Sequence, residues 1–444
     1  MKSFPHPLAI LLSFIVLATL LTHLLPAGQY QRIADPETGR DVIVPGSYQQ
    51  TEAEPVGFFE MFVKVPEGVV FGADIVILIL IIGGAFVVID KTGAFNEGLH
   101  ALIRAFPDSQ FKVLIVLGVV FATVGFLNNT FEEIIAMIPF LVVLGDRLGY
   151  RRVSMVAISA GSAAIGATFS PINPFGTLLA QKVADVEPLS GWAFRVILFL
   201  IALTFWISWV IRNGKDESVK STTLDMDHDT AFSIRSGIIL SLFVITFGVM
   251  VYGILEWNWD YNQMSALFFG MGILCGFIGK LGINGTSKAY ATGFQEMAFA
   301  AVVVGLARSM YLIFDDGQII DTMVYGLFTP LEEVPVALSA VGMTLSQALL
   351  HIPVASNSGQ AVLTMPLLAP LADLLGMSRQ VMIMCYQFGA ILMDLITPTN
   401  GALLAMLVAA KSSYKEWIQF CIKPYLLLLA FGLVAIFVAI GLGL

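Results

Sequence analysis

Two short polar runs interrupt an otherwise apolar chain of 444 residues. The first run is Asn128-Asn129-Thr130, and the second is Ser356-Asn357-Ser358. Amide and hydroxyl oxygens can replace the water shell of a small cation, and the backbone of an interrupted helix offers further carbonyl and N–H groups. The two runs therefore predict a binding site for an ion and a small solute, built where helices are interrupted.

A proline-containing break follows each polar run. The first break is Ser170-Pro171-Ile172-Asn173-Pro174, and the second is Thr397-Pro398-Thr399-Asn400. Proline removes a backbone donor, and each break adds an asparagine amide. One such break is usually a structural kink, but two matched breaks, each paired with a polar run, favour an ion site. The ion-binding residues that we expect at and beside the breaks, for Na+ or alternatively H+, are Ser170, Asn173, Thr397, Thr399, Asn400 and Asp394.

Ionisable residues inside apolar segments are candidates for function, because charge at membrane depth is costly. Arg308 suits a solute carboxylate, and an internal ion pair with Asp394 or Glu132 is an equally good interpretation. Glu132 and Glu133 are candidates for binding a cation, a proton or a solute amine. One of the two could instead form an ion pair with an arginine. His351 could titrate near neutral pH, but we interpret it as bonded to backbone. Among these ionisable residues, the ones that we expect to bind solute are Arg308, Glu132 and Glu133.

The residues around these sites recur at one fixed spacing, which indicates that the chain contains an internal duplication. Each half carries its own polar run and its own break. The pairs separated by 227 positions are Pro139 and Pro366, Asp146 and Asp373, Gly149 and Gly376, Arg152 and Arg379, Pro171 and Pro398, and Asn173 and Asn400.

Composition places the chain in a membrane. Hydrophobic residues make up 57% of it and charged residues 12%, which is too little polar surface for a water-soluble globule of this length. About 20 mainly apolar residues span a bilayer as a helix. Runs of that kind lie at 8–25, 72–90, 192–211, 233–255, 262–280, 292–314 and 418–442.

The placement of lysine and arginine predicts the orientation. With the N-terminus in the cytoplasm, sixteen of these residues lie on the cytoplasmic side and five outside, while acidic residues collect in the exterior loops. We therefore expect a multi-pass protein of the cytoplasmic (inner) membrane, with a cytoplasmic N-terminus and an exterior C-terminus. The chain has no basic face for nucleic acid.

This orientation predicts two re-entrant hairpins, because residues 111–147 begin and end among cytoplasmic-type charges and residues 333–375 begin and end among exterior-type residues. The expected fold is an all-α polytopic membrane protein, an inverted repeat with two hairpins and two broken transmembrane helices. The first repeat is 1–211, with spans 8–25 and 72–90, hairpin 111–147, broken span 153–185 and span 192–211. A linker, 212–261, holds the extra span 233–255. The second repeat is 262–444, with spans 262–280 and 292–314, hairpin 333–375, broken span 379–410 and span 418–442.

Several motifs resemble a known family. The polar runs look like the Ser-Asn-Thr signature of the ion transporter superfamily that includes the divalent anion/sodium symporters, although the first run begins with Asn and the second ends in Ser. Closer matches are Leu25-Pro26-Ala27-Gly28-Gln29-Tyr30, Asn173-Pro174-Phe175-Gly176, Gly305-Leu306-Ala307-Arg308 and Ser358-Gly359-Gln360-Ala361. These resemble the anaerobic C4-dicarboxylate carrier family, in particular its YfcC-like branch, over nearly the whole chain. The resemblance implies an elevator-type secondary transporter, often a homodimer, whose polar runs hold Na+ and touch a solute carboxylate. It gives a role in ion binding to Asn128, Asn129, Ser356 and Asn357, and a role in solute binding to Asn129, Thr130, Asn357 and Ser358.

No motif of an enzyme stands out: the sequence has no catalytic constellation, no cofactor-binding loop and no metal-ligand spacing beyond the suspected Na+ site. The competing classes are a secondary transporter and, less favoured, an ion channel. We expect uptake or exchange of a small carboxylate-bearing solute, such as a dicarboxylate, driven by Na+. The alternative is a proton-coupled or exchange carrier for amino acids or short peptides, motivated by Glu132, Glu133 and Asp394.

Overall fold

The computed structural model describes residues 7–34, 41–95, 97–98, 101, 110–127, 131–135, 137–215, 232–257 and 259–444. Helices dominate these residues, because an apolar segment in a membrane must satisfy its backbone internally. Six of the described helical stretches are long and apolar enough to cross a bilayer. They are Ala73–Lys91, Arg152–Phe169, Trp192–Asn213, Tyr261–Ile278, Gly282–Asp316 and Tyr414–Leu442.

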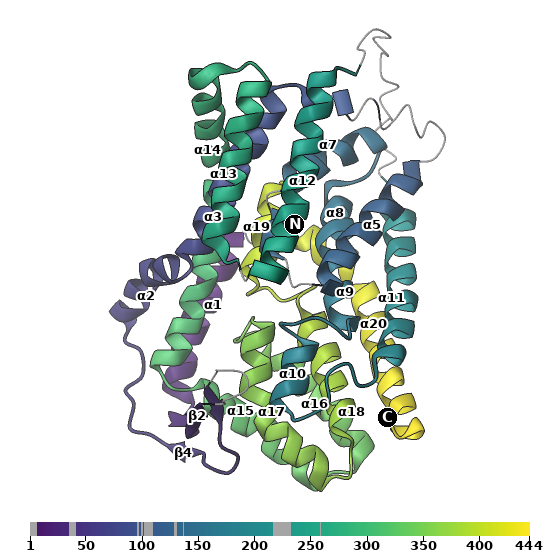
Figure 1. Ribbon diagram of the computed structural model, residues 1–444. Helices are drawn as coiled ribbons and strands as arrows, with labels where there is room; N and C mark the ends of the chain where they lie inside the picture. The colour runs from purple at the N-terminus through teal and green to yellow at the C-terminus, as the bar shows by residue number, and fades with distance from the viewer. Residues whose placement is uncertain are drawn as a thin grey trace.

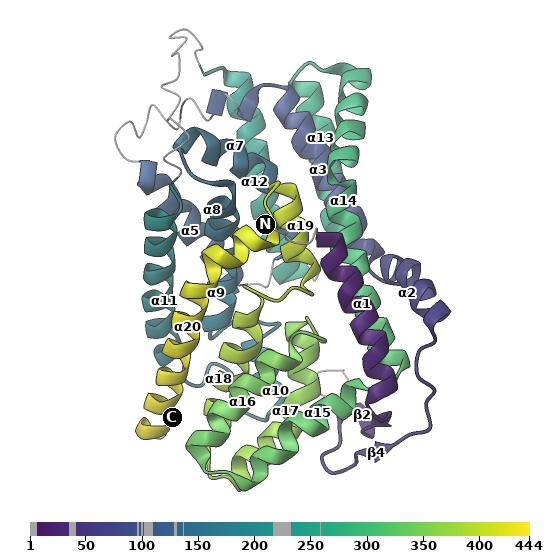
Figure 2. The same ribbon diagram turned by 180° about the vertical axis from the view of Figure 1, so that it is seen from behind.

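One group of helices forms the left side of the molecule in Figure 1. The long helix α14 packs against α1, α2 and α3 there, and α13 contacts α3 and α12. Figure 2, from behind, again shows α1 beside α14. The bounds are α1 Pro7–Leu24, α2 Phe58–Phe71, α3 Ala73–Lys91, α12 Ile234–Trp257, α13 Tyr261–Ile278 and α14 Gly282–Asp316. Helix α14 begins well before the expected span 292–314.

Four short strands follow α1, and the sequence did not predict them. β1 (Gly28–Gln29) pairs antiparallel with β4 (Gln49–Gln50), and β2 (Arg32–Ala34) pairs antiparallel with β3 (Asp41–Ile43). They lie at the lower end of the molecule in Figure 1. The first long loop is thus folded into two small ladders.

Two groups of helices occupy the regions where hairpins were expected. The first comprises α5 (Gln110–Leu127), the short α6 (Glu132–Ile135) and α7 (Ile138–Leu148). The second comprises α16 (Val336–Leu350) and α17 (Asn357–Leu374), preceded by α15 (Ile320–Phe328) and a 3-10 turn, η2 (Thr329–Glu333).

Each predicted broken span consists of helical pieces separated by an irregular stretch. The first runs through α8 (Arg152–Val156), the π-helical turn η1 (Ala157–Gly161) and α9 (Ser162–Phe169) to α10 (Thr177–Val183). The second runs through α18 (Arg379–Tyr386), the π-helical turn η3 (Gln387–Ile391) and α19 (Gly401–Ala409). Ser170 is extended before Pro171, as a residue preceding proline prefers. Helices α11 (Trp192–Asn213) and α20 (Tyr414–Leu442) follow the two broken spans.

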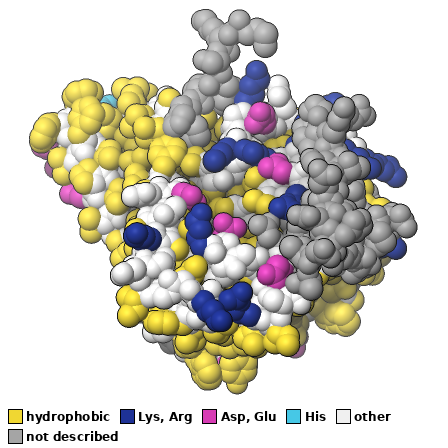
Figure 3. All heavy atoms as spheres, turned by 90° about the horizontal axis from the view of Figure 1, so that it is seen from above, with side chains coloured by type: hydrophobic (Ala, Val, Ile, Leu, Met, Phe, Trp, Pro, Cys, Tyr) yellow, Lys and Arg dark blue, Asp and Glu magenta, His cyan; other side chains and the backbone are white. Residues whose placement is uncertain are grey.

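Residues at the 227-residue spacing build two matching corners between each hairpin and its broken span. Gly149 and Gly376 both have left-handed backbone, with φ of 73° and 68°, which glycine adopts without strain. An ion pair closes each corner: Arg152 with Asp146 at 3.3 Å, and Arg379 with Asp373 at 2.7 Å. The first corner lies at the upper end of Figure 1 and the second at the lower end. Figure 3 looks down on the upper end, where lysine and arginine side chains gather.

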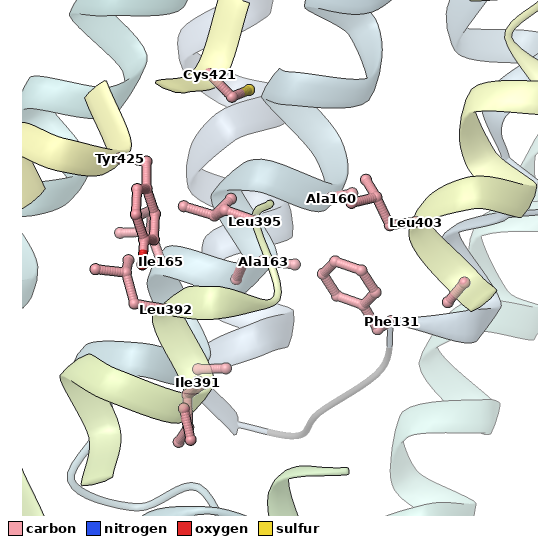
Figure 4. Packing of buried hydrophobic residues seen from close by; sticks show 14 of the residues in the cluster. Phe131, Ala160, Ala163, Ile165, Ile391, Leu392, Leu395, Leu403, Cys421 and Tyr425 are labelled. Atoms are coloured by element: carbon pink, nitrogen blue, oxygen red, sulfur yellow. The ribbon is translucent and has the colours of Figure 1, made fainter. Parts of the chain in front are cut away.

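The broken spans form the centre of the main hydrophobic core, with α20 and the hairpins around them. Close approach of α5 and α9 depends on glycine: a Cβ at Gly125 would lie 2.0 Å from the carbonyl oxygen of Ala163, and one at Gly166 would lie 2.1 Å from that of Ala122. Figure 4 shows part of this core, including Phe131, Ala160, Ala163, Ile165, Ile391, Leu392, Leu395, Leu403, Cys421 and Tyr425.

Candidate functional site

The second polar run and the second break meet around the buried side chain of Asp394. Asn357 donates its amide Nδ2 to Asp394 Oδ2 at 2.8 Å, and Asn400 donates its Nδ2 to Asp394 Oδ1 at 2.8 Å. The orientation of the Asn400 amide follows from its oxygen, which accepts the backbone N–H of Leu403 at 3.1 Å and caps α19. The structure thus brings together three of the expected ion-binding residues.

His351 joins the same cluster, and the expectation that it bonds to backbone was wrong. Its ring is fully buried at the end of α16. Nε2 lies 3.0 Å from Asp394 Oδ1, and Nδ1 lies 2.8 Å from Gln360 Oε1. The partners are therefore side chains, one from α17 of the same hairpin and one from the broken span.

A chain of neutral side chains fixes the orientation of this ring. The Thr364 hydroxyl donates to the backbone oxygen of Gln360 and accepts from Gln347 Nε2, both at 2.8 Å. The Gln347 side-chain oxygen therefore faces Gln360 Nε2, which donates to it and to the Gln347 backbone oxygen. Gln360 Oε1 can then only accept, so Nδ1 of His351 carries a proton. Nothing in the hydropathy pattern singled out these glutamines.

Each break is tied to the hairpin of its own half. Thr399 donates its hydroxyl to the backbone oxygen of Ile352, just after α16, at 2.6 Å. In the first half, Ser170 donates to the backbone oxygen of Phe126, near the end of α5, at 2.6 Å. Both bonds satisfy carbonyls at a helix end and hold an arm of the hairpin against the break.

Asn173 makes the equivalent connection in the first break. Its Nδ2 donates to the backbone oxygen of Gly125 at 3.0 Å, and its Oδ1 accepts the N–H groups of Phe175 at 3.0 Å and Gly176 at 2.9 Å. This side chain therefore caps the approach to α10 while it contacts α5.

The first polar run, Asn128, Asn129 and Thr130, lies outside the described residues, as does the side chain of Glu133, whose backbone is in α6. In the second half, Ser356 caps α17 by accepting the Gly359 N–H at 3.3 Å. Ser358 lies in the first turn of that helix and is partly exposed. Thr397 is fully buried, and its hydroxyl has no hydrogen-bond partner among the described residues.

A cavity of about 460 Å³ lies against this cluster. One wall includes residues from the second polar run and break, from α6 and from α14; these are Ser356, Gly359, Thr399, Asn400, Gly401, Glu132 and Arg308. Its other end is lined by residues of the first long loop and of the α14–α15 junction; these include Gly28, Gln29, Arg32, Asp315, Gln318 and Asp321. Predicted site residues far apart in the sequence thus share one space.

Arg308 is partly buried in this wall. Its guanidinium carbon lies 5.9 Å from the centre of the Phe71 ring, within the range of a cation–π contact. The expected internal ion pair with Asp394 is not formed: the described groups that contact the Asp394 carboxyl group are the donating amides of Asn357 and Asn400 and the ring of His351. No ion pair joins Arg308 to Glu132 either, although both line the cavity.

A second buried cation, Arg195 on α11, connects the two broken spans and was not singled out in the sequence. It donates to Gln387 Oε1 at 2.7 Å and to Gln380 Oε1 at 2.9 Å. Gln387 in turn donates its Nε2 to the backbone oxygens of Thr168 and Ser170 at 3.0 and 3.1 Å. A side chain of the second broken span therefore satisfies carbonyls at the first break.

Comparisons with known proteins give consistent family matches. The sequence profile of the family DcuC, C4-dicarboxylate anaerobic carrier, matches residues 4–441. A protein of Haemophilus influenzae with the name "Uncharacterized protein" is 27% identical over 99% of this chain and 97% of its own length. "Putative basic amino acid antiporter YfcC" of Escherichia coli K12 is 28% identical over 94% of this chain and 92% of its own.

Two solved structures of transporters are also similar. The YdaH transporter of Alcanivorax borkumensis has a TM-score of 0.44 at 16% identity and covers 99% of both chains. MtrF of Neisseria gonorrhoeae, placed by its title in a class of antimetabolite efflux pumps, has a TM-score of 0.43 at 16% identity and covers 98% of this chain and 95% of its own.

Proposed function

Because this chain belongs to the C4-dicarboxylate anaerobic carrier family, a family of membrane transporters, we propose that it moves a small carboxylate-bearing solute by secondary active transport driven by Na+. The observation that carries the proposal is the cavity in which Arg308 lies beside the second polar run and the second break. No other arrangement in the described residues joins a free guanidinium to so many expected site residues.

Arg308 supplies the recognition of the carboxylate. Its guanidinium forms no described ion pair, and it presents planar donors that match two carboxylate oxygens. A guanidinium without an anionic partner in this position costs free energy unless a ligand or water compensates its charge. We therefore assign Arg308 to solute binding and not to stabilisation of the fold. The N-terminus of α19, beginning at Gly401 in the same wall, adds N–H groups and a positive dipole end.

Oxygen donors around the second break suit Na+. The Thr397 hydroxyl is buried and unpartnered among the described residues, and it lies in the irregular stretch between η3 and α19. We propose that Asn357, Thr397, Thr399, Asn400 and Asp394 hold the coupling ion in the second half, and that Asn128, Asn129, Ser170 and Asn173 do so in the first. Ser170 and Thr399 each tie a break to an arm of its hairpin, so ion occupancy and hairpin position are linked in this proposal.

The proposed mechanism is alternating access by two repeats of opposite orientation. The matched corners at Gly149 and Gly376, at opposite ends of Figure 1, support an inverted repeat. We assign the hairpins, broken spans, α11 and α20 to a moving unit that slides against α1–α3 and α12–α14 in an elevator movement. The proposed protein is a homodimer in the cytoplasmic (inner) membrane with its N-terminus inside.

A second candidate is exchange or proton-coupled transport of amino acids. Glu132 and Asp315 line the same cavity as Arg308, so a zwitterion would find partners for both its amine and its carboxylate. The name of the E. coli relative points to basic amino acids for that protein. Short peptides fall under the same candidate because they carry the same two end groups.

Uptake into proteoliposomes discriminates between the two candidates. Labelled succinate, L-arginine and alanylalanine are offered while the Na+ gradient and the pH gradient are varied separately. The first proposal expects succinate uptake that a Na+ gradient accelerates and a pH gradient does not. Uptake that ignores Na+ would refute Na+ coupling, and uptake of L-arginine alone would favour the second candidate.

A further inference from the structure

The end of the cavity beside β2 and α15 contains an arginine that neither the sequence pattern nor the comparisons assign. Arg32 lies in β2, in the first long loop, and lines the cavity together with Asp321 of α15. The Arg32 side chain is 39% exposed, whereas that of Asp321 is 4% exposed. The cation therefore remains open to the cavity while its carboxylate partner is buried behind it.

Asp321 holds this guanidinium in a fixed position. Its Oδ1 accepts Nη2 of Arg32 at 2.8 Å, and its Oδ2 accepts the backbone N–H of Tyr30 at 2.9 Å. Arg32 Nη1 also donates to the backbone oxygen of Tyr30 at 3.3 Å. These bonds use two of the five N–H groups of Arg32, so three remain for a ligand.

The loop that carries Arg32 is itself fastened to the α14–α15 region. Thr51 donates to Gln318 Oε1 at 2.7 Å, and the Gly28 N–H donates to the Gln318 backbone oxygen at 2.9 Å. Tyr48 stacks on Tyr325 with ring centres 4.3 Å apart and planes at 8°. Arg32 is therefore held before any solute arrives, which lowers the entropy cost of binding.

We propose that Arg32 is a second carboxylate-recognition residue, an outer docking point that a solute occupies before it reaches Arg308. The inference rests on the proposed function, because it concerns the same cavity and the same class of solute. Asp321 is a positioning residue that acts through Arg32. A purely structural ion pair would explain the contact between the two side chains, but it gives no reason for the guanidinium to line the cavity with part of its surface exposed.

Direction-resolved transport by the reconstituted full chain tests this role. Succinate and L-arginine are presented either at the face that carries β1 and β2 or at the opposite face. Arg32→Gln is expected to raise the half-saturation concentration about tenfold at the first face, through the loss of hydrogen bonds to a charged group, with little change in maximal rate. Arg32→Lys should recover part of the affinity, since it restores the charge without the planar fork.

Lys64→Gln is the matched control. Lys64 is another cation on the same side, bonded to Glu67 at 2.8 Å and to Asp316, but it does not line the cavity. The hydrogen bonds to Asp316 and Glu67 raise the pKa of Lys64 well above its usual range, so it stays charged throughout the assay. Its substitution is expected to leave half-saturation within about twofold of wild type.

The outcomes separate the two proposals. Wild-type transport with unchanged half-saturation in both Arg32 variants would overturn the docking role alone, and so would a fall in maximal rate with unchanged half-saturation. The absence of saturable transport of any solute by the wild type would remove the proposed function and this inference with it.

Discussion

Asn357 connects the second polar run to the second break through one hydrogen bond to Asp394. Asn357→Ala removes a donor from a buried carboxylate, at a cost of ~1.5–3 kcal/mol. We expect the Na+ dependence of solute uptake to weaken at least about tenfold, because the ion site loses an oxygen and its anchor to the hairpin. Titration of uptake against Na+ concentration measures this effect.

Asn213→Ala is the control for that substitution. Asn213 lies at the end of α11, exposed, and donates its amide only to the backbone oxygen of Trp209. Its removal should leave the Na+ titration unchanged. If Asn357→Ala and Asn213→Ala give the same wild-type curve, the proposed ion site in the second half is wrong.

At the scale of single residues, the sequence predicted the types of residue in the site better than the contacts between their side chains. Proline and asparagine at fixed spacing indicated the breaks, and a charge in an apolar run indicated Arg308. The hydrogen-bond partners of His351 were not predictable, because Asp394 is 43 positions away and Gln360 carries no charge that would single it out. Contacts of that kind depend on how the hairpin packs against the broken span.

Between elements, Arg195 and Gln387 join the two broken spans. Gln387→Leu leaves Arg195 as a buried cation short of an acceptor and leaves carbonyls at the first break unbonded, so we expect a loss of ~2–4 kcal/mol. Arg195→Met removes the charge together with its need for partners, at an expected ~1–3 kcal/mol. The double variant should therefore lose less stability than the two losses added together.

Thermal unfolding in detergent measures this cycle, with Arg212→Met, an exposed arginine on the same helix, as the control. Strictly additive losses would show that the two side chains act separately. In that case the broken spans would not be coupled through this contact.

The contact between α5 and α9 gives another test at the element scale. Gly166→Ala puts a methyl group 2.1 Å from the carbonyl oxygen of Ala122, so the helices must separate, at a cost of ~1–3 kcal/mol. Gly248→Ala in α12 meets nothing within 4 Å and should be neutral or stabilising by ~0.5–1 kcal/mol. Equal unfolding temperatures for the two variants would contradict the close packing of the first hairpin against the first broken span.

Element positions followed from the sequence where hydropathy changes sharply and not elsewhere. Helix α3 at Ala73–Lys91 coincides with the expected span 72–90. Helix α14 begins at Gly282, ten residues before the expected span 292–314. Hydropathy missed this start because the first turns of α14 contain polar residues such as Thr286 and Lys288. The strands in the first long loop were missed because they are only two or three residues long. Tyr30, between β1 and β2, is bonded to Asp321 of α15, a contact far apart in the sequence.

For the whole molecule, the family and the class of membrane transporter were predicted from the sequence and are confirmed by the family match. The division into inverted repeats remains a prediction, supported by two corners of equal construction at opposite ends of the fold. Those corners were recognisable because glycine, aspartate and arginine are each needed there for a different physical reason. The position of the cavity was not recognisable, since it depends on the packing of α14 against α19.

The central claim is that a solute binds at Arg308 and crosses by alternating access. Counterflow in proteoliposomes tests it most directly: vesicles loaded with unlabelled solute are diluted into labelled solute without an ion gradient. The account predicts transient, saturable accumulation of label in the wild type and its loss in Arg308→Gln, a variant that should still purify as a folded protein. Flux that rises linearly with concentration, or accumulation undiminished in Arg308→Gln, would contradict it.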